Sequence, residues 1–261
     1  DRAVTYFVMR AGHKKMKPVH KATVEAHGDQ WTRAENFVGN GAFNVGNWVV
    51  NERLVLKRNE QYWDNENTII EKVTALVITD ENTALTRYLA GELDWTQVPA
   101  GQFPALSADY PEQAISVPEA CSYYYMFNLR EDGPEALKDK RVRQAANYAI
   151  NKSAIVNDVL EGTAEVAAGP TPPAFAWAYN PDLEPYAYDP DKARALIAEA
   201  GAEGAELTFF VTEGGSGMLD PIAMGTAIQA DLQAVGLTVN IKTYEWNTFL
   251  GEVNPGLEGK A

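Results

Sequence analysis

The feature that most constrains the fold of this 261-residue sequence is a strand–helix–strand pattern between residues 206 and 241. Glu206–Thr212 is rich in strand-forming residues, and Pro221–Val235 carries apolar residues at helical spacing before Gly236 ends the helix. Leu237–Ile241 then alternates apolar and polar residues, which predicts a second strand. This order is that of a β-α-β unit, so the second half of the chain is expected to be an α/β lobe.

The residues before this unit contain further helices and a strand. Ser122–Leu129 is predicted to be a strand of high aromatic density, and Lys140–Ile150 has apolar residues along one helical face. Asn151 is interpreted as the start of another helix, and Asp189, which a proline follows, as the start of the next. The proline-rich residues 169–185 predict a long loop or a surface arm.

The first half of the chain shows a similar order of elements. Ala42–Arg58 is predicted to form a β-hairpin, and Lys72–Ile78 a further strand. Asp80 is suited to begin a helix, and a short strand is predicted at Leu93–Trp95. Two separate strand–helix–strand patterns predict two α/β lobes, with a boundary near Val117–Cys121.

The charge balance limits the partners that the chain can bind. It has 36 acidic and 22 basic residues, which gives a formal net charge of −14. This excess repels phosphate backbones and anionic lipid surfaces, so no nucleic acid is expected as a partner. No apolar run approaches the ~20 residues of a membrane-spanning helix, so direct membrane insertion is not expected either.

No group of residues forms a distinctive catalytic or metal-binding pattern. His13, His20 and His27 are evenly spaced, which makes a metal site conceivable, but the segment around them is poorly periodic. Glu213–Gly217 lies where phosphate-binding loops occur, yet the Gly-Lys-Ser/Thr of such loops is missing. The Gly-x-Ser-x-Gly turn of many serine hydrolases is also missing. We therefore expect neither an enzyme, nor a cofactor, nor a bound metal.

Aromatic residues and one cysteine are the other notable residue types. Six tryptophans and twelve tyrosines could line a binding surface or fill a core. Trp31, Trp48 and Trp63 are expected in the core. Cys121 is the only cysteine, and we expect it to be buried or partly buried at the start of a strand, without a nucleophilic role.

Several motifs spread along the chain carry a resemblance to a known family. In order, they are Glu35–Phe43, Trp48–Asn59, Tyr62-Trp63-Asp64, Gly91-Glu92-Leu93-Asp94, Cys121–Asn128, Asp139–Ala145, Tyr148-Ala149-Ile150, Gly169-Pro170, Pro172-Pro173, Tyr188–Ala193, Glu199-Ala200-Gly201, Ile228–Leu232, Val235-Gly236-Leu237 and Glu245-Trp246. Together they resemble the family 5 extracellular solute-binding proteins, the oligopeptide, dipeptide and nickel carriers of ABC importers. The resemblance covers nearly the whole chain.

This resemblance implies an α/β fold of the two-lobed type II periplasmic-binding-protein architecture, incomplete, with the central portion only. It assigns residues 1–18 to the tail of a missing inserted domain, residues 19–118 to a portion of lobe I, and residues 119–261 to a second α/β lobe truncated at its C-terminus. The acid that pairs with a peptide's amino terminus would then lie beyond Ala261. Cys121 matches a cysteine that some members join by a disulfide to the same absent region.

The function implied by the resemblance is that of the extracytoplasmic component of an ABC importer, which binds peptides by hinge closure and without catalysis. Its expected partners are a peptide ligand and the permease subunits, and the protein is expected to be monomeric. It is expected in the periplasm or another extracytoplasmic space, associated with the membrane through the transporter. The alternatives are a nickel chelate, haem or sugar on the same scaffold, an α/β enzyme, or a peptide-sensing receptor.

Four residues are carried over from the family as walls of the ligand site. They are Val98, Tyr124, Gly215 and Trp246. Two neighbouring positions depart from the best-known oligopeptide carriers, with Glu119 in place of an aromatic residue and Met126 in place of an acid. The resemblance therefore favours peptides as ligands but implies no preferred length.

Overall fold

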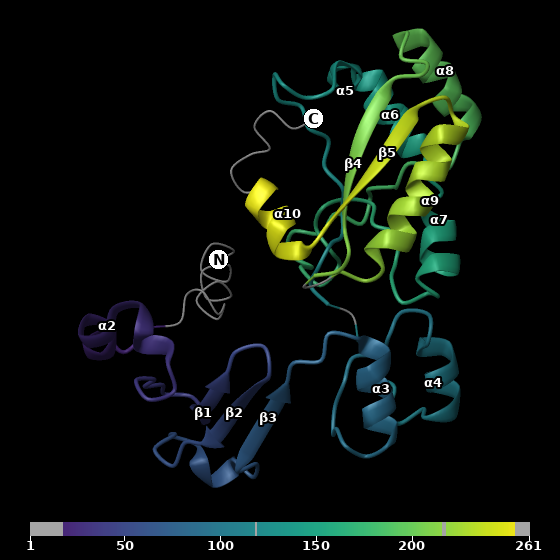
Figure 1. The fold of residues 1–261 in the computed structure, drawn as a ribbon. Coiled ribbons are helices and arrows are strands. Elements are labelled where there is room, and N and C mark those ends of the chain that lie inside the picture. Colours follow the sequence, from purple (N-terminus) through teal and green to yellow (C-terminus); the bar gives the residue numbers. More distant parts are fainter. Residues whose placement is uncertain (1–17, 118, 216–217, 254–261) are drawn as a thin grey trace. The chain divides into compact units, whose positions relative to one another are not determined.

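A computed structural model describes residues 18–117, 119–215 and 218–253. The chain divides into two compact units, Asp1–Gln97 and Val98–Ala261, which are described separately below (Figure 1). This division precedes the predicted lobe boundary between residues 118 and 119. That boundary concerns the lobes of a longer protein and stays a prediction, and the assignment of residues 1–18 falls almost entirely outside the described residues.

The first unit is built around a three-stranded antiparallel sheet in the order β1-β2-β3. Its described elements are α2 (Lys21–His27), a 3₁₀ turn η2 (Gly28–Thr32), β1 (Phe43–Val49), β2 (Arg53–Arg58), a 3₁₀ turn η3 (Asn65–Asn67), β3 (Lys72–Leu76) and α3 (Glu81–Leu89). The hairpin predicted within Ala42–Arg58 is confirmed, as is the strand predicted at Lys72–Ile78. The Asp80 carboxylate accepts a hydrogen bond from the Thr83 backbone N–H at 2.6 Å, so it begins α3 as predicted.

The short strand predicted at Leu93–Trp95 is wrong. These residues follow Gly91, whose φ of 76° ends α3, and they run as irregular chain without a ladder partner among the described residues. A strand of three residues is stable only when it can pair, and no described strand pairs with these residues. The first unit is therefore an antiparallel sheet with separate helices rather than a strand–helix–strand unit.

The second unit contains the β-α-β unit that the sequence predicts. β4 and β5 are parallel, with Glu206 opposite Thr238 and Thr212 opposite Tyr244, and α9 makes the crossover. The described elements of this unit are α4 (Phe103–Asp109), α5 (Glu135–Lys138), α6 (Lys140–Ala149), α7 (Lys152–Ala154), a π-helical turn η4 (Ile155–Val159), α8 (Pro190–Ala200), β4 (Glu206–Thr212), α9 (Pro221–Ala234), β5 (Thr238–Tyr244) and α10 (Trp246–Val253). The proline-rich residues 169–185 contain no helix or strand, as predicted.

One hydrophobic core holds the second unit together. Helix α6 contributes the stripe predicted from its spacing, and all four of its members are buried: Val142, Ala145, Ala146 and Ala149. Helix α8 packs against α6 with Ala193 and Ile197, and the strands add Leu207 and Val239 to the same cluster. Helix α9 approaches β4 closely because Gly225 has no side chain; a Cβ there would lie 2.8 Å from Val211 Cγ2.

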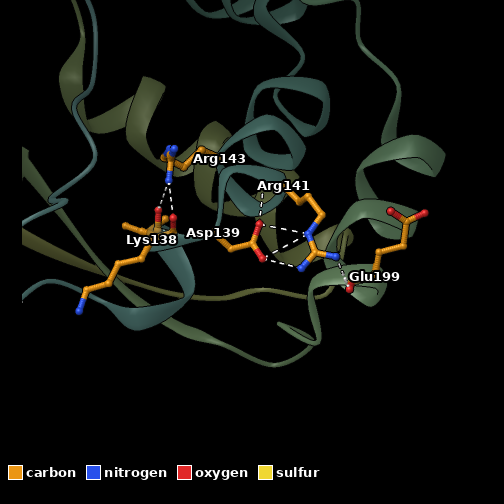
Figure 2. A network of polar contacts seen from close by, with 6 residues as sticks. Lys138, Asp139, Arg141, Arg143 and Glu199 are labelled. Atoms are coloured by element: carbon orange, nitrogen blue, oxygen red, sulfur yellow. Dashed lines mark hydrogen bonds and ion pairs between the residues drawn. The ribbon is translucent and has the colours of Figure 1, made fainter.

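A polar network joins the ends of three helices in this unit (Figure 2). The Asp139 carboxylate caps α6 by accepting a hydrogen bond from the Arg141 backbone N–H at 2.8 Å, and it also pairs with the Arg141 guanidinium at 2.6 Å. The guanidinium in turn donates to the Glu199 carbonyl at the end of α8 (2.7 Å). Arg143 donates to the carbonyls of Leu137 and Lys138 at the end of α5. The hydrogen bonds from Arg141 hold the pKa of Asp139 down at about 2.

Further predictions of burial and of strand pairing are also wrong. Ser122–Leu129 has no ladder partner among the described residues, so it is extended chain rather than a strand of a sheet. Cys121, predicted to be at least partly buried, is exposed. Trp48 and Trp63, predicted to be core residues, are 52% and 84% exposed, and Trp31 is partly buried against Phe37.

Candidate ligand-binding site

The carboxyl ends of β4 and β5 bring two loop segments together. Parallel strands end at the same edge of their sheet, and open α/β sheets bind ligands outside that edge. The Glu213 backbone N–H donates to the Tyr244 carbonyl at 2.9 Å, which holds the two segments together just past the last pair of the ladder. The segment after β4 continues into Gly214 and Gly215, and the segment after β5 enters α10 at Trp246.

Gly215 and Trp246 are in direct contact. A Cβ at position 215 would lie 2.6 Å from two atoms of the Trp246 ring, Cδ2 and Cε3. The φ angle of Gly215 is 145°, which side chains also disfavour. Only glycine therefore allows the indole to pack on this stretch of backbone.

The start of α10 holds Trp246 in place. The Glu245 carboxylate accepts hydrogen bonds from the Thr248 backbone N–H and the Asn247 side-chain amide, each at 3.0 Å. Hydrogen bonds from the backbone at Asn247 and Thr248 lower the pKa of Glu245, so the carboxylate stays ionised at neutral pH. The Trp246 ring stacks on Phe249 of the same helix, with 6.1 Å between centroids and an interplanar angle of 23°.

Further aromatic rings continue from Trp246 toward the sheet. Tyr244 is buried and lies 6.3 Å from Phe249 and 5.2 Å from Phe210, measured between ring centroids. The Lys242 ammonium lies over the Tyr244 ring, 5.0 Å from its centroid. The edge of the sheet is thus an aromatic platform consisting of Phe210, Tyr244, Trp246 and Phe249, with a glycine loop on one side of the tryptophan.

Two of the four predicted wall residues, Gly215 and Trp246, are in contact with each other, and the other two belong to other segments of the chain. Tyr124 is 65% exposed, between Tyr123 and Tyr125, which both pack on the core. The Tyr123 and Tyr125 hydroxyl oxygens are 3.3 Å apart, and the Tyr125 ring lies 4.8 Å from that of Phe209. Val98 is half-buried in the loop before α4. A common wall formed by all four residues, and their contact with a ligand, stay predictions.

Sequence reasoning missed Phe210, Tyr244 and Phe249 as parts of this platform. The alternation of β4 and β5 could have placed Phe210 and Tyr244 on one face, since the register sets Phe210 opposite Lys242 and Thr212 opposite Tyr244. The spacing of three between Trp246 and Phe249 could have indicated a shared helical face, once a helix was predicted there.

The alternative sites considered from the sequence receive no support from the described residues. His20 accepts or donates a 2.6 Å hydrogen bond with the Thr23 hydroxyl. Among the residues described, no three histidine, cysteine or acidic side chains are grouped as metal ligands would be; His13 lies outside them. The Ser216-Gly217 part of the glycine loop is likewise outside the described residues. Within the same limits, no helix is long and apolar enough to cross a membrane.

A hollow lies elsewhere on this unit. It has a volume of about 430 Å³ and is lined by Tyr148, Glu184, Pro185, Tyr186, Ala187, Asp189 and Lys192. Lys192 Nζ donates to the Tyr148 hydroxyl at 2.8 Å and lies 4.1 Å from the Tyr148 ring centroid. These contacts tie α8 to α6 and so give Lys192 and Tyr148 a packing role, and no residue of this hollow was predicted to bind ligand.

Comparison with known proteins gives a consistent set of similarities. Residues 3–256 match the family model described as bacterial extracellular solute-binding proteins, family 5 middle. The chain is 37% identical to the periplasmic oligopeptide-binding protein OppA of Salmonella typhimurium over 97% of its own length and 47% of the relative's. It is 33% identical to the periplasmic murein peptide-binding protein MppA of Escherichia coli, over 98% and 48% of the two lengths.

Solved structures agree with these relatives. The structure of the E. coli murein tripeptide-binding protein MppA matches with a TM-score of 0.76 and 34% identity, over 92% of this chain and 47% of that one. The Helicobacter pylori periplasmic binding protein DppA, solved with the peptide STSA, matches with a TM-score of 0.77 and 26% identity, over 94% and 47%. The chain therefore spans about half the length of the relatives that it matches, and within that span it shares their fold.

Proposed function

Because this chain belongs to family 5 of the bacterial extracellular solute-binding proteins, we propose that it is part of a peptide-binding component of an ABC importer. The family is one of binding proteins, which agrees with the expectation that the chain is no enzyme. The relatives described above are named for oligopeptides and murein peptides. Peptides are therefore the ligand class that the similarity supports best.

The observation that carries this proposal is the packing of Trp246 on Gly215 at the carboxyl ends of β4 and β5. A large flat ring beside bare backbone offers an apolar surface next to main-chain polar groups. Extended peptides need both, since main-chain hydrogen bonds give affinity and roomy pockets accept varied side chains. The aromatic platform would supply the apolar surface, and the backbone of the glycine loop would supply the polar groups. Neither contact depends on a particular peptide sequence.

We infer that binding proceeds by hinge closure between two lobes. In such a mechanism the ligand bridges surfaces that are separate in the open protein, and its contacts with both lobes stabilise the closed form. Tyr124 and Val98 would then complete the wall that Trp246 and Gly215 begin. The closed, loaded form would be recognised by the permease subunits.

The proposed location is the periplasm, or the equivalent space outside another cell envelope, and the proposed state is a monomer. The relatives named above are periplasmic. The net charge of −14 favours a dissolved protein that is not drawn to anionic lipid. Association with the membrane would then occur through the permease.

The experiment that tests this function is calorimetric titration of the complete gene product with a mixed peptide library and then with single peptides. We expect Trp246→Ala to weaken binding by roughly 1–3 kcal/mol, or about 5- to 150-fold, because an anchoring aromatic ring is lost. Trp177→Ala is the matched control, since it removes a tryptophan from the same unit, outside the platform, and should leave the affinity unchanged. Equal affinities of wild type and Trp246→Ala would refute the site.

Mass spectrometry of small molecules that co-purify with the complete protein distinguishes peptides from other cargo. One relative, 30% identical over 85% of this chain, is named heme-binding protein A of Haemophilus influenzae. Recovery of haem, a nickel chelate or a sugar in place of peptides would keep the family and change the ligand. Recovery of a chemically altered peptide would revive the enzyme alternative.

A further inference from the structure

Lys242 lies beside the aromatic platform, on the side of the β4–β5 sheet that faces away from the core. The register sets Lys242 opposite Phe210, and Tyr244 shares their side because alternate residues of a strand point the same way. The core residues Leu207 and Val239 point to the other side. The Lys242 ammonium is 5.8 Å from the Phe210 ring centroid and 5.0 Å from that of Tyr244. Both distances are within the range of about 6 Å in which an aromatic ring attracts a cation.

Helix α10 directs side chains back to the same side of the sheet. Trp246, Phe249 and Glu252 follow one another at intervals of three residues, so each is the neighbour of the next on the helix surface. Phe249 lies 6.3 Å from Tyr244, measured between ring centroids. The Tyr244 side chain chiefly, and the negative charge of Glu252 in addition, raise the pKa of Lys242, so its ammonium is charged at neutral pH. One side of α10 therefore extends from the glycine loop, past Tyr244, to Lys242.

The attachment of α10 to the rest of the unit is slight. None of its residues is buried, and none belongs to the hydrophobic core formed by the described residues. The hydrogen bonds of the Glu245 carboxylate go to Asn247 and Thr248, at the start of the same helix. They fix where the helix begins but do not join it to the sheet. The side-chain contacts with Tyr244 and Lys242 are then what orients the body of α10 against β5.

We propose that Lys242 is a positioning residue for the ligand site: its ammonium links the aromatic platform to the Glu252 carboxylate and so holds α10 at the angle that places Trp246 on the glycine loop. Lys242 itself would not touch the ligand. It precedes the last ladder pair of the sheet, whereas Trp246 and the glycine loop lie beyond that pair. An apolar side chain of similar length would cover the rings as the lysine stem does, but it could not attract the carboxylate.

The proposal rests on the proposed function for its effect on affinity, but its effect on Trp246 can be observed without any ligand. The same unit offers a matched control. The Lys192 ammonium lies 4.1 Å from the Tyr148 ring centroid, which is a contact of the same kind outside the platform. Loss of this second contact should leave Trp246 undisturbed.

Tryptophan emission of the complete gene product is the first measurement. Lys242→Met keeps the length of the side chain and removes its charge, Lys242→Arg keeps the charge, and Lys192→Met is the control. Each variant is also made in a Trp246→Phe background, so that the difference between the two spectra reports Trp246 alone among the six tryptophans. We expect Lys242→Met to shift the Trp246 emission to longer wavelength, because the indole becomes more exposed to water. Lys242→Arg and Lys192→Met should leave it unchanged.

Affinity for trialanine, measured by calorimetric titration, is the second measurement. Lys242→Met should weaken binding roughly two- to fivefold, the size of an exposed contact between a cation and an aromatic ring. Lys242→Arg should restore the wild-type affinity. In a Trp246→Ala background Lys242→Met should have no further effect, because a residue that acts through the indole cannot act once the indole is gone.

Three outcomes would overturn the proposal. Unchanged Trp246 emission in Lys242→Met, or an equal shift in Lys192→Met, would show that Lys242 does not specifically hold α10. A loss of affinity that persists in the Trp246→Ala background would show that Lys242 contacts the peptide directly. Failure of Lys242→Arg to restore the emission would show that the charge is not what acts.

Two further results separate the proposal from folding and from the proposed function. Should Lys242→Met not fold, Glu252→Gln removes the other charge of the pair, and the absence of an emission shift there would equally overturn the proposal. If neither trialanine nor the mixed peptide library binds to the wild type while the emission changes as expected, the proposed function is refuted and the positioning role of Lys242 stands.

Discussion

The two units of this chain differ in what holds them together. In the second unit, Val142 and Ile197 are 0% exposed, in a core shared by four helices and two strands. In the described first unit the sheet register, the hairpin and the cap of α3 are all formed, yet only two hydrophobic residues are buried. Local sequence signals are therefore equally clear in both units, but tertiary burial is present in one.

Well-formed helices and strands therefore do not by themselves make a stable domain. Hydrogen bonds of a sheet exchange with water at little net gain, and most of the stabilisation comes from apolar burial. A unit without burial depends on a neighbour. Substitutions at equivalent features of the two units test this difference.

The largest difference is expected for core truncation. Ile197→Ala should destabilise the chain by about 2–5 kcal/mol, because it removes fully buried carbon atoms and leaves a cavity. Leu56→Ala in the first unit should cost roughly 0.5 kcal/mol or less in the 261-residue chain, because its side chain stays partly in water there. Urea denaturation followed by circular dichroism measures both, and similar losses would mean that the first unit has a core of its own.

A smaller effect is expected where the second unit is tightly fitted at its edge. Gly215→Ala places a Cβ 2.6 Å from the Trp246 ring in an unfavourable φ region, so the indole must move. We expect a loss of roughly 1–3 kcal/mol in stability and a shift in Trp246 emission. Gly214→Ala is the matched control, since a Cβ there meets nothing within 4 Å. Equal emission spectra for the two variants would show that Trp246 is not fixed on the glycine loop.

Much of this fold could be predicted because the deciding signals are local. The helix starts predicted at Asp80 and Asp189 depend on a side chain and a backbone N–H three residues away. The β-α-β unit was equally readable, since the strand and helix periodicities differ and glycines mark their ends.

The predictions that were wrong all depended on distant chain. Alternation correctly indicates that Tyr124 faces away from Tyr123 and Tyr125, but it cannot say whether Ser122–Leu129 finds a strand to pair with. The exposure of Trp48 and Trp63 could not be predicted either, because the sequence around an aromatic residue does not show whether a distant part of the chain packs on its side chain. In the site, the contact between Gly215 and Trp246 joins two loops that only the parallel pairing of β4 and β5 brings together.

The smallest effect is expected at the helix caps, where each unit has an aspartate of lowered pKa. The pKa of Asp139 is about 2, chiefly through the side chain and backbone of Arg141, whereas hydrogen bonds from Thr83 lower that of Asp80. A carboxylate whose pKa is lower in the folded protein stabilises the folded state at pH values above its ordinary pKa of 3.8. This contribution is lost as the pH falls toward 2.

Removing these caps should therefore affect the two units differently. Asp139→Asn should lower the global urea midpoint at pH 7 and progressively less as the pH falls from about 4 toward 2, because α6 belongs to the cooperative core of its unit. Asp80→Asn should leave that midpoint nearly unchanged and appear only as faster hydrogen exchange within α3, since local opening there does not expose a shared core. Denaturation at several pH values, combined with residue-resolved exchange, measures both. A global urea midpoint that responds equally to the two variants would show that the two units unfold together. The units would then differ in apolar burial but not in stability.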